Sequence, residues 1–186
     1  MIEPLKLKPV KFKSKEYYKT KELYKNAFPH KERISLRLLS LRALSKNIEY
    51  LAMYDEDRFV GFCYLIMYNN LTFIMYLAID SSLRGKGYGG RALDSIRVFT
   101  SKNRVALNIE AEDENAENND QRIRRKSFYI KNGYRLANMD TIEMGEAYEM
   151  LSYGGEKVAK SEYVTLLKNF ATPILSPFIK YAVKFR

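Results

Sequence analysis

Glycine recurs at four of the six positions in Gly85-Lys86-Gly87-Tyr88-Gly89-Gly90, directly before a segment with helical spacing. The apolar run 73–79 shortly before this stretch has the composition of a β-strand. Glycines allow positive φ angles and a close approach of the backbone to an anion. The N-terminus of a helix adds unpaired N–H groups and the positive end of the helix dipole. The sequence therefore predicts a phosphate-binding turn between a strand and a helix.

Two common phosphate-binding patterns fit this turn poorly. A P-loop requires Lys and then Ser or Thr next to its last glycine, whereas arginine and alanine stand there. The dinucleotide fingerprint Gly-x-Gly-x-x-Gly is present as Gly85, Gly87 and Gly90, and Glu110 lies about twenty residues further on, where a ribose-binding acid would sit. The first glycine follows its strand too late, however, and the remaining chain is too short for a second nucleotide-binding half. An NAD-binding oxidoreductase is therefore only an alternative.

A third pattern covers the whole segment. Arg84-x-x-Gly87-x-Gly89, preceded by an apolar strand, resembles motif A of the GNAT superfamily, the acyl-CoA-dependent N-acetyltransferases. Further on, Phe128-Tyr129-x-x-x-Gly133-Tyr134 resembles the helix–turn signature of the same family. The resemblance implies an α/β fold with a central, mostly antiparallel twisted sheet. Its fourth and fifth strands would be parallel and splay apart, and helices would flank the sheet.

The resemblance also implies acetyl-CoA as the cosubstrate, without a metal. Backbone N–H groups of the turn would hold the coenzyme pyrophosphate, and the strand before it would pair with pantetheine. A main-chain N–H near Leu77 would point at the thioester oxygen. The coenzyme-binding residues implied in this way are Leu77, Ala78, Ile79, Arg84, Gly85, Lys86, Gly87, Tyr88, Gly89, Asn118 and Tyr129.

Acetyl transfer also needs help for the departing thiolate and a route for the amine proton. By resemblance, Tyr129 is the general acid, although a phenol of pKa about 10 facing a thiol of pKa about 8.5 gives a modest driving force. Glu110 or Glu112, at the end of the fifth strand, could act as the base, and each could equally be a solvated loop acid. His30, the only histidine, is expected in a loop.

One position departs from the family pattern. Many members have an asparagine about seven residues before the helix tyrosine, where its side chain meets the coenzyme, and this chain has Arg122 there. Asn118 or Asn119 could substitute through a small shift of the loop.

The resemblance implies an acceptor site built by the first two helices and their loop, with help from the last strands, which are residues 27–37 and 141–148 here. A cationic amine could be recognised by Glu32, Glu143, Glu146 and Glu149. A carboxylate could instead be bound by Arg33 and Arg37. We expect a small amine or an amino-acid derivative as the acceptor, and a peptide amine next. A non-catalytic acyl-CoA-binding module is the second alternative.

Length and composition agree with a small enzyme. The 186 residues are expected to form one domain, 1–155, and a C-terminal helical appendage, 156–186, packed on the domain or on a partner subunit. A single cysteine, Cys63, excludes a disulfide within the chain and lies in an apolar run. Residues 1–50 hold 13 Lys and Arg against 5 Glu, which we interpret as solvated surface without a nucleic-acid partner. No signal peptide or membrane span is expected, so we predict a cytoplasmic protein that could form a homodimer.

The periodicity predicts the elements that position these residues. Helices are expected at 14–27, 32–44, 88–101, 122–132 and 161–170, and Gly133 is placed to end the fourth of them. The second helix should bury Ile34, Leu38 and Leu41. Strands are expected at 5–10, 48–54, 59–68, 71–79, 104–110 and within 141–152.

Overall fold

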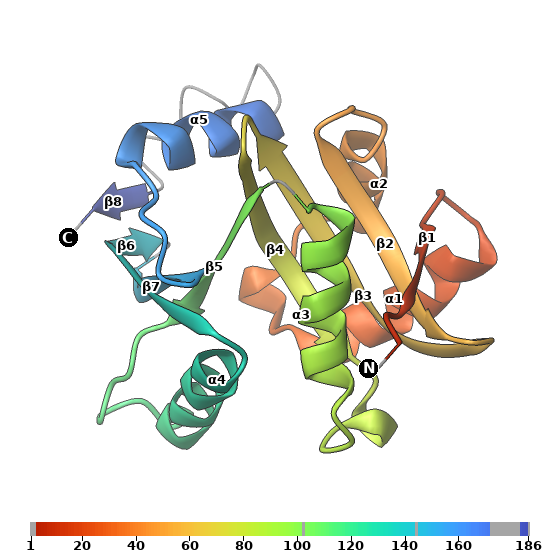
Figure 1. Ribbon diagram of the computed structural model, residues 1–186, viewed down its shortest axis with the longest axis horizontal. Helices are drawn as coiled ribbons and strands as arrows, with labels where there is room; N and C mark the ends of the chain where they lie inside the picture. The colour runs from red at the N-terminus through yellow and green to blue at the C-terminus, as the bar shows by residue number, and fades with distance from the viewer. Residues whose placement is uncertain (1–2, 102, 144, 172–182, 186) are drawn as a thin grey trace. The chain divides into compact units, whose positions relative to one another are not determined.

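The computed structural model describes residues 3–101, 103–143, 145–171 and 183–185. Its strands form one mixed sheet in the order β1-β2-β3-β4-β5-β7-β6-β8 (Figure 1). The strands are β1 Lys6–Pro9, β2 Ile48–Asp55, β3 Arg58–Tyr68, β4 Leu71–Ile79, β5 Arg104–Glu110, β6 Tyr134–Glu143, β7 Glu146–Tyr153 and β8 Val183–Phe185. The helices are α1 Lys15–Ala27, α2 Leu36–Arg42, α3 Tyr88–Phe99, α4 Asn119–Lys131 and α5 Lys160–Phe170, with 3-10 turns η1 His30–Glu32 and η2 Ser81–Leu83.

Strands β4 and β5 are parallel, as predicted, and pair over a short length. The register begins with Leu71 opposite Arg104 and ends with Phe73 opposite Ala106. Strand β4 then continues to Ile79 without further pairing to β5. The predicted fold class, a mostly antiparallel mixed sheet with one parallel pair and flanking helices, is confirmed.

The chain divides into two compact units, which are described separately. The first comprises Met1–Met67 and Ile74–Ser101, and the second comprises Tyr68–Phe73 and Lys102–Arg186. The boundary falls within β4, so its first three residues belong to the second unit and the remainder to the first.

In the first unit, helices cover both faces of the antiparallel strands (Figure 1). On one face, α3 buries Ala92, Leu93 and Ile96. On the other face, aromatic side chains connect the sheet to α1 and α2. Tyr50 Oη donates to Thr20 Oγ1 at 2.8 Å, and Tyr64 Oη donates to the Leu39 carbonyl oxygen. The rings on this face have centroids 4.9–6.4 Å apart, and they belong to Tyr24, Phe28, Tyr50, Phe62, Tyr64 and Tyr76.

Strands β3 and β4 approach each other closely at Gly61. A Cβ atom at this position would lie 2.1 Å from the Ala78 carbonyl oxygen, a distance that no side chain tolerates. Two residues further along, the Asp80 N–H donates to the Val60 carbonyl oxygen at 2.8 Å. The Ala78 carbonyl and the Asp80 N–H therefore both face β3. Because backbone polar groups point to alternate edges along a strand, those of Leu77 and Ile79 face the other edge of β4.

In the second unit, β5, β7 and β6 form antiparallel pairs, and β8 pairs with the outer edge of β6. Helix α5 packs through Tyr163, whose ring lies 5.2 Å from that of Phe73. Arg104 holds the start of α5 through Glu162 at 2.5 Å, and this contact lowers the pKa of the Glu162 carboxyl. Glu162 also accepts a hydrogen bond from the Ala159 N–H, so it caps the helix.

The prediction for the second helix was wrong in extent and in the face it buries. A 3-10 turn and an extended segment occupy residues 30–35, and α2 is confined to Leu36–Arg42. Leu39 and Ser40 are buried, whereas Leu41 is 61% exposed. The leucines at 36, 38, 39, 41 and 44 leave more than one possible apolar face, so the periodicity did not select the correct one.

Three further boundaries bear on the predicted elements. Strand β6 begins at Tyr134, seven residues before the predicted strand, and α4 begins at Asn119 instead of residue 122. Gly133 follows α4 with a φ of 86°, as predicted for the residue that ends this helix. Helix α5 lies where a helix was predicted, whereas residues 172–182 of the expected appendage lie outside the described residues. Among the described residues, no helix has the length and apolar character needed to span a bilayer.

We expect Gly61→Ala to destabilise the protein by about 1–3 kcal/mol, because a new methyl group would displace the Ala78 backbone. Urea unfolding followed by far-UV circular dichroism measures this change. A free energy of unfolding within about 0.5 kcal/mol of the wild type would contradict the close approach.

Candidate active site

The glycine turn between η2 and α3 has the backbone geometry of an anion site. Gly85 and Gly87 have φ angles of 74° and 83°, which glycine adopts without strain. None of the N–H groups from Gly85 to Gly90 has an acceptor among the described residues. A Cβ atom added to Gly85 or Gly87 would meet no described atom within 4 Å. The turn is therefore open to a ligand and carries a series of free donors.

Neighbouring contacts fix the start of this turn. Leu83 is buried and anchors η2, while the Asp80 carboxylate accepts hydrogen bonds from the N–H and hydroxyl of Ser82. These bonds lower the pKa of the Asp80 carboxyl. Lys86 Nζ donates to the Ser82 carbonyl oxygen at 3.0 Å, and Arg84 is exposed. Two cations therefore lie beside the free donors.

The first turn of α3 is fixed by a second set of contacts. Tyr88 Oη donates to Asp55 Oδ2 at 2.8 Å, and Arg91 Nη2 lies 2.7 Å from Asp55 Oδ1. Arg91 and then Tyr88 lower the pKa of the Asp55 carboxyl through these hydrogen bonds. The Tyr88 hydroxyl is thus hydrogen-bonded to Asp55 of β2. Tyr88 and Gly89 were both expected to bind the coenzyme. Their backbone N–H groups have no acceptor among the described residues and so remain available for it.

The predicted coenzyme-pairing residues lie at the end of β4. Because Ala78 and Asp80 direct their polar backbone groups toward β3, Leu77 and Ile79 direct theirs toward the opposite edge. Pairing with β5 ends at Phe73, so no described strand receives these groups. The Leu77 N–H therefore faces away from β3, on the edge of β4 that no described strand pairs beyond Phe73.

The predicted acceptor residues Glu32 and Arg33 lie in the segment between α1 and α2, also in the first unit. Tyr76 Oη donates to the Glu32 carbonyl oxygen at 2.8 Å. Tyr24 Oη accepts a hydrogen bond from the Ile34 N–H and donates to the Ile34 carbonyl oxygen. Two tyrosines thus tie the backbone on either side of Arg33 to β4 and α1.

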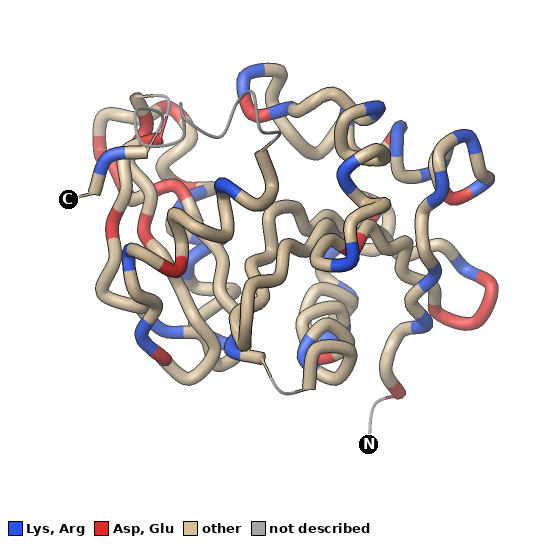
Figure 2. The backbone as a smooth tube through the Cα atoms, turned by 90° about the horizontal axis from the view of Figure 1, so that it is seen from above, with Lys and Arg blue, Asp and Glu red and all other residues tan. Residues whose placement is uncertain are grey.

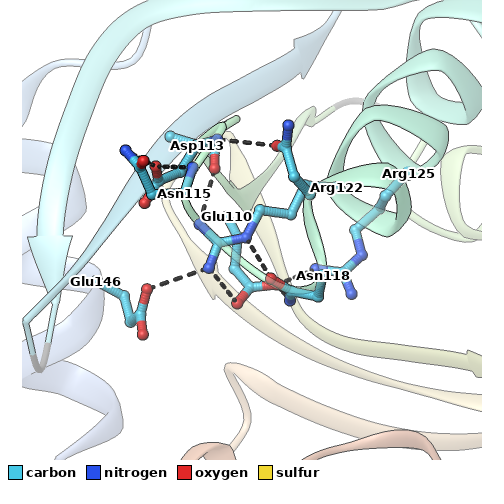
Figure 3. Close-up of polar contacts among 9 residues, drawn as sticks. Glu110, Asp113, Asn115, Asn118, Arg122, Arg125 and Glu146 are labelled. Carbon is cyan, nitrogen blue, oxygen red and sulfur yellow. Dashed lines mark hydrogen bonds and ion pairs between the residues drawn. The ribbon is translucent and has the colours of Figure 1, made fainter.

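In the second unit, Glu110 belongs to a buried cluster of charges (Figure 3). Its Oε2 atom lies 2.9 Å from Arg125 Nη1, and its Oε1 atom lies 3.4 Å from Arg122 Nη2. Glu146 approaches Arg122 at 3.3 Å. Only 6–7% of the side chains of Glu110 and Arg122 is exposed, so this carboxylate is held between two guanidinium groups away from solvent. Glu112, the other candidate base, pairs with Lys126 at 3.3 Å.

Sequence reasoning identified Arg122 as a departure from the family pattern but missed its structural role. Its Nε donates to Asn118 Oδ1 at 3.0 Å, and its Nη1 donates to the Ala111 carbonyl oxygen at 2.9 Å. The side chain of Asn118, which was expected to replace the missing coenzyme contact, is therefore committed to Arg122 and lies 3.5 Å from Glu110. The signal for this role is the pair of carboxylates, Glu110 and Glu146, that the fold brings to Arg122. Neither lies near residue 122 in the sequence.

Tyr129 lies one turn after Arg125 on α4. Its hydroxyl has no hydrogen-bond partner among the described residues, and burial raises its pKa to about 12 although Arg125 lowers it. Its ring packs edge-on against those of Phe128 and Tyr134. The phenol therefore stays protonated over the physiological range, with its donor free.

Glu143, the remaining predicted acceptor residue, holds elements of the second unit together. Its Oε1 atom accepts hydrogen bonds from Asn108 Nδ2, Thr141 Oγ1 and Tyr163 Oη at 2.8–2.9 Å. Burial and then the Glu143 charge raise the pKa of the Tyr163 phenol well above its usual value. This carboxylate thereby connects α5 to β5 and β6.

Comparisons with known proteins agree with this geometry. The family profile described as "Acetyltransferase (GNAT) domain" matches residues 46–136. A Bacteroides thetaiotaomicron protein assigned to the GNAT family superposes with a TM-score of 0.69 at 22% identity, covering 96% of this chain and 99% of that one. An aminoglycoside 6'-N-acetyltransferase complexed with coenzyme A gives 0.62 at 14% identity over 83% of this chain and 99% of that one. The ribosomal-protein-S18-alanine N-acetyltransferase of Escherichia coli gives 0.58 at 12% identity, with 84% and 97% covered. No curated protein sequence matches the chain.

Residues 46–136 match the acetyltransferase (GNAT) domain family, as the two motifs within this segment predict. The match to the family profile contains the glycine turn, strand β5 and the helix that carries Tyr129. The Bacteroides thetaiotaomicron structure, at 22% identity, shows that the similarity in fold covers 96% of this chain.

We expect Arg122→Gln to lower the free energy of unfolding by about 3 kcal/mol, because it removes the cation that the buried Glu110 shares with the half-buried Glu146. Arg124→Gln, an exposed neighbour on the same helix, is the matched control and should change stability by less than about 0.5 kcal/mol. Chemical denaturation measures the free energy of unfolding of both variants and of the wild type. Equal stabilities would show that Arg122 is not the centre of the cluster.

Proposed function

We propose that this protein is an acetyl-CoA-dependent N-acetyltransferase that moves an acetyl group directly to a primary amine. The observation that carries the proposal is the open turn before α3, where the N–H groups from Gly85 to Gly90 have no acceptor among the described residues. Such a turn binds a pyrophosphate through direct hydrogen bonds and the helix dipole. Arg84 and Lys86 add positive charge beside it.

Main-chain groups of β4 supply the next part of the mechanism. The Leu77 N–H would donate to the thioester oxygen, and Ala78 and Ile79 would continue the backbone that faces pantetheine. A donor held by a strand is already oriented before negative charge develops on the oxygen, so it stabilises the transition state more than a mobile group would. As the amine nitrogen bonds to the carbonyl carbon, the carbon–sulfur bond breaks and the amine proton leaves to solvent.

Tyr129 would stabilise the departing sulfur, mainly as a hydrogen-bond donor. With a pKa of about 12, its phenol holds its proton far more tightly than a thiol of pKa about 8.5 does. Complete transfer to the thiolate would therefore be uphill by about 5 kcal/mol. We propose that Tyr129 donates a hydrogen bond to the developing thiolate, which then takes its proton from solvent.

Glu110 enters the proposal as a positioning residue. Both of its oxygens contact arginines, so neither is directed at an incoming amine. Its salt bridge with Arg125 instead fixes the turn of α4 that precedes Tyr129. We therefore propose that Glu110 orients this helix and does not act as the general base. The amine would reach the site already deprotonated or lose its proton through water.

Coenzyme affinity tests the turn directly. We expect Gly87→Ala to weaken coenzyme A binding about tenfold, because alanine at a φ of 83° is strained by about 1–2 kcal/mol and the turn must shift. Gly145→Ala has the same kind of strain, with a φ of 88° and open space around it, and should bind coenzyme A as the wild type does. Isothermal titration calorimetry measures both variants. Unchanged affinity for Gly87→Ala, or binding of NAD in place of coenzyme A, would reject the cradle.

For Tyr129→Phe we expect kcat to fall about 10- to 100-fold with little change in the KM for acetyl-CoA. The reason is that the variant loses one hydrogen-bond donor to the leaving sulfur, an interaction made in the transition state. Because the phenol has a raised pKa, it stays protonated well above pH 10, so wild type and variant should have pH–rate profiles of the same shape up to that pH. Thiol release from acetyl-CoA follows the reaction. An alkaline loss of activity below pH 10 that disappears in the variant would contradict this assignment.

A further inference from the structure

The segment between α1 and α2 forms a depression of about 430 Å³ in the first unit. Its charged and titratable lining is entirely basic apart from two tyrosines, and consists of Lys21, Lys25, His30, Arg33 and Arg37. No aspartate or glutamate of the described part of the chain lines it. Figure 2 shows Lys and Arg recurring along the chain as it leaves the N-terminus, the part of the chain that contains α1.

These cations are poorly neutralised by the protein. Among the described residues, the only ion pair in the depression joins Lys25 to Glu22 at 3.9 Å, and both of those side chains are exposed. Lys21, Arg33 and Arg37 have no carboxylate partner within the described part of the chain. Arg33 Nε is buried without a hydrogen-bond partner among the residues that the structure describes. Like charges gathered in this way repel one another, and an anion between them would relieve the repulsion.

The depression is connected to the proposed thioester site through β4. Tyr76 precedes Leu77 in the strand, and its hydroxyl holds the Glu32 carbonyl one residue before Arg33. Its ring lies edge-on to that of Tyr24 at 5.1 Å, and Tyr24 lines the depression. The basic lining is therefore fixed relative to the strand that would orient the thioester.

We propose that this depression binds an oxyanion of the acceptor, so the acceptor is a primary amine that also carries a carboxylate or a phosphate. The inference rests on the proposed acetyl transfer and narrows its substrate class. Arg33 and Arg37 provide planar donors that suit both oxyanions, and Lys21 adds charge from α1. A purely cationic amine would be repelled by the same lining.

Matched acceptor pairs test the proposal by thiol release from acetyl-CoA. β-Alanine against β-alaninamide examines the carboxylate, and phosphoethanolamine against ethanolamine examines the phosphate. We expect the wild type to favour the anionic member of at least one pair about tenfold or more in kcat/KM. Arg33→Gln and Arg37→Gln should raise the KM for that member about 10- to 100-fold, the effect of losing a charge-assisted hydrogen bond, and leave the neutral member unchanged. Lys46→Gln, an exposed lysine outside the depression, should leave both unchanged.

A binding measurement separates this inference from the proposed function. Calorimetry with N-acetyl-β-alanine and its amide requires no turnover, and we expect only the acid to bind, more weakly in Arg37→Gln and at high salt. Binding of the acid without thiol release from any amine would refute the acetyl transfer and retain the anion site. Equal use of neutral and anionic acceptors, with no effect of Arg33→Gln or of the exposed Arg37→Gln, would overturn the anion site and retain the acetyl transfer.

Discussion

The early end of pairing between β4 and β5 is the constraint on which the site depends. A buried backbone group must find a partner, and β4 meets this demand in two ways. Toward β3 it is paired closely enough that only glycine fits at position 61. Toward β5 the pairing stops at Phe73, so Leu77 and Ile79 keep backbone donors and acceptors for water or a ligand. The same strand is thus rigid on one edge and available on the other, which is what orientation of a thioester requires.

Charge is handled differently in the two units. In the second unit, Glu110 and Glu146 neutralise the buried Arg122, and Asn118 and the Ala111 carbonyl satisfy its remaining donors. Loss of Glu110 would therefore leave Arg122 buried with the half-buried Glu146 as its remaining ion-pair partner among the described residues. In the first unit, Lys21, Arg33 and Arg37 are exposed or half-buried and have no carboxylate partner among the described residues. A fully compensated cluster serves structure, whereas an uncompensated one has charge to offer a ligand.

Local patterns predicted the parts of the fold that depend on local geometry. The glycine turn, the end of α4 at Gly133 and the parallel β4–β5 connection follow from residue types at short spacing, and they are confirmed. Strand β6 was missed over its first seven residues because a register shift between Leu136 and Asp140 breaks its alternation. The partners of Arg122 were missed because Glu110 and Glu146 lie 12 and 24 residues away in the sequence, and only the folded chain brings them together.

The position of Tyr76 explains how the proposed acceptor loop between α1 and α2, which has little regular structure, is held in place. The segment from Pro29 to Ser35 has one short 3-10 turn, so its own hydrogen bonds cannot hold it. Instead, Tyr76 binds the Glu32 carbonyl, and Tyr24 binds both backbone groups of Ile34. Each tyrosine is buried in the aromatic face of the sheet, where neighbouring rings restrict its movement. The strand that would align the thioester therefore also sets the position of Arg33, and through it the charge that an acceptor must carry.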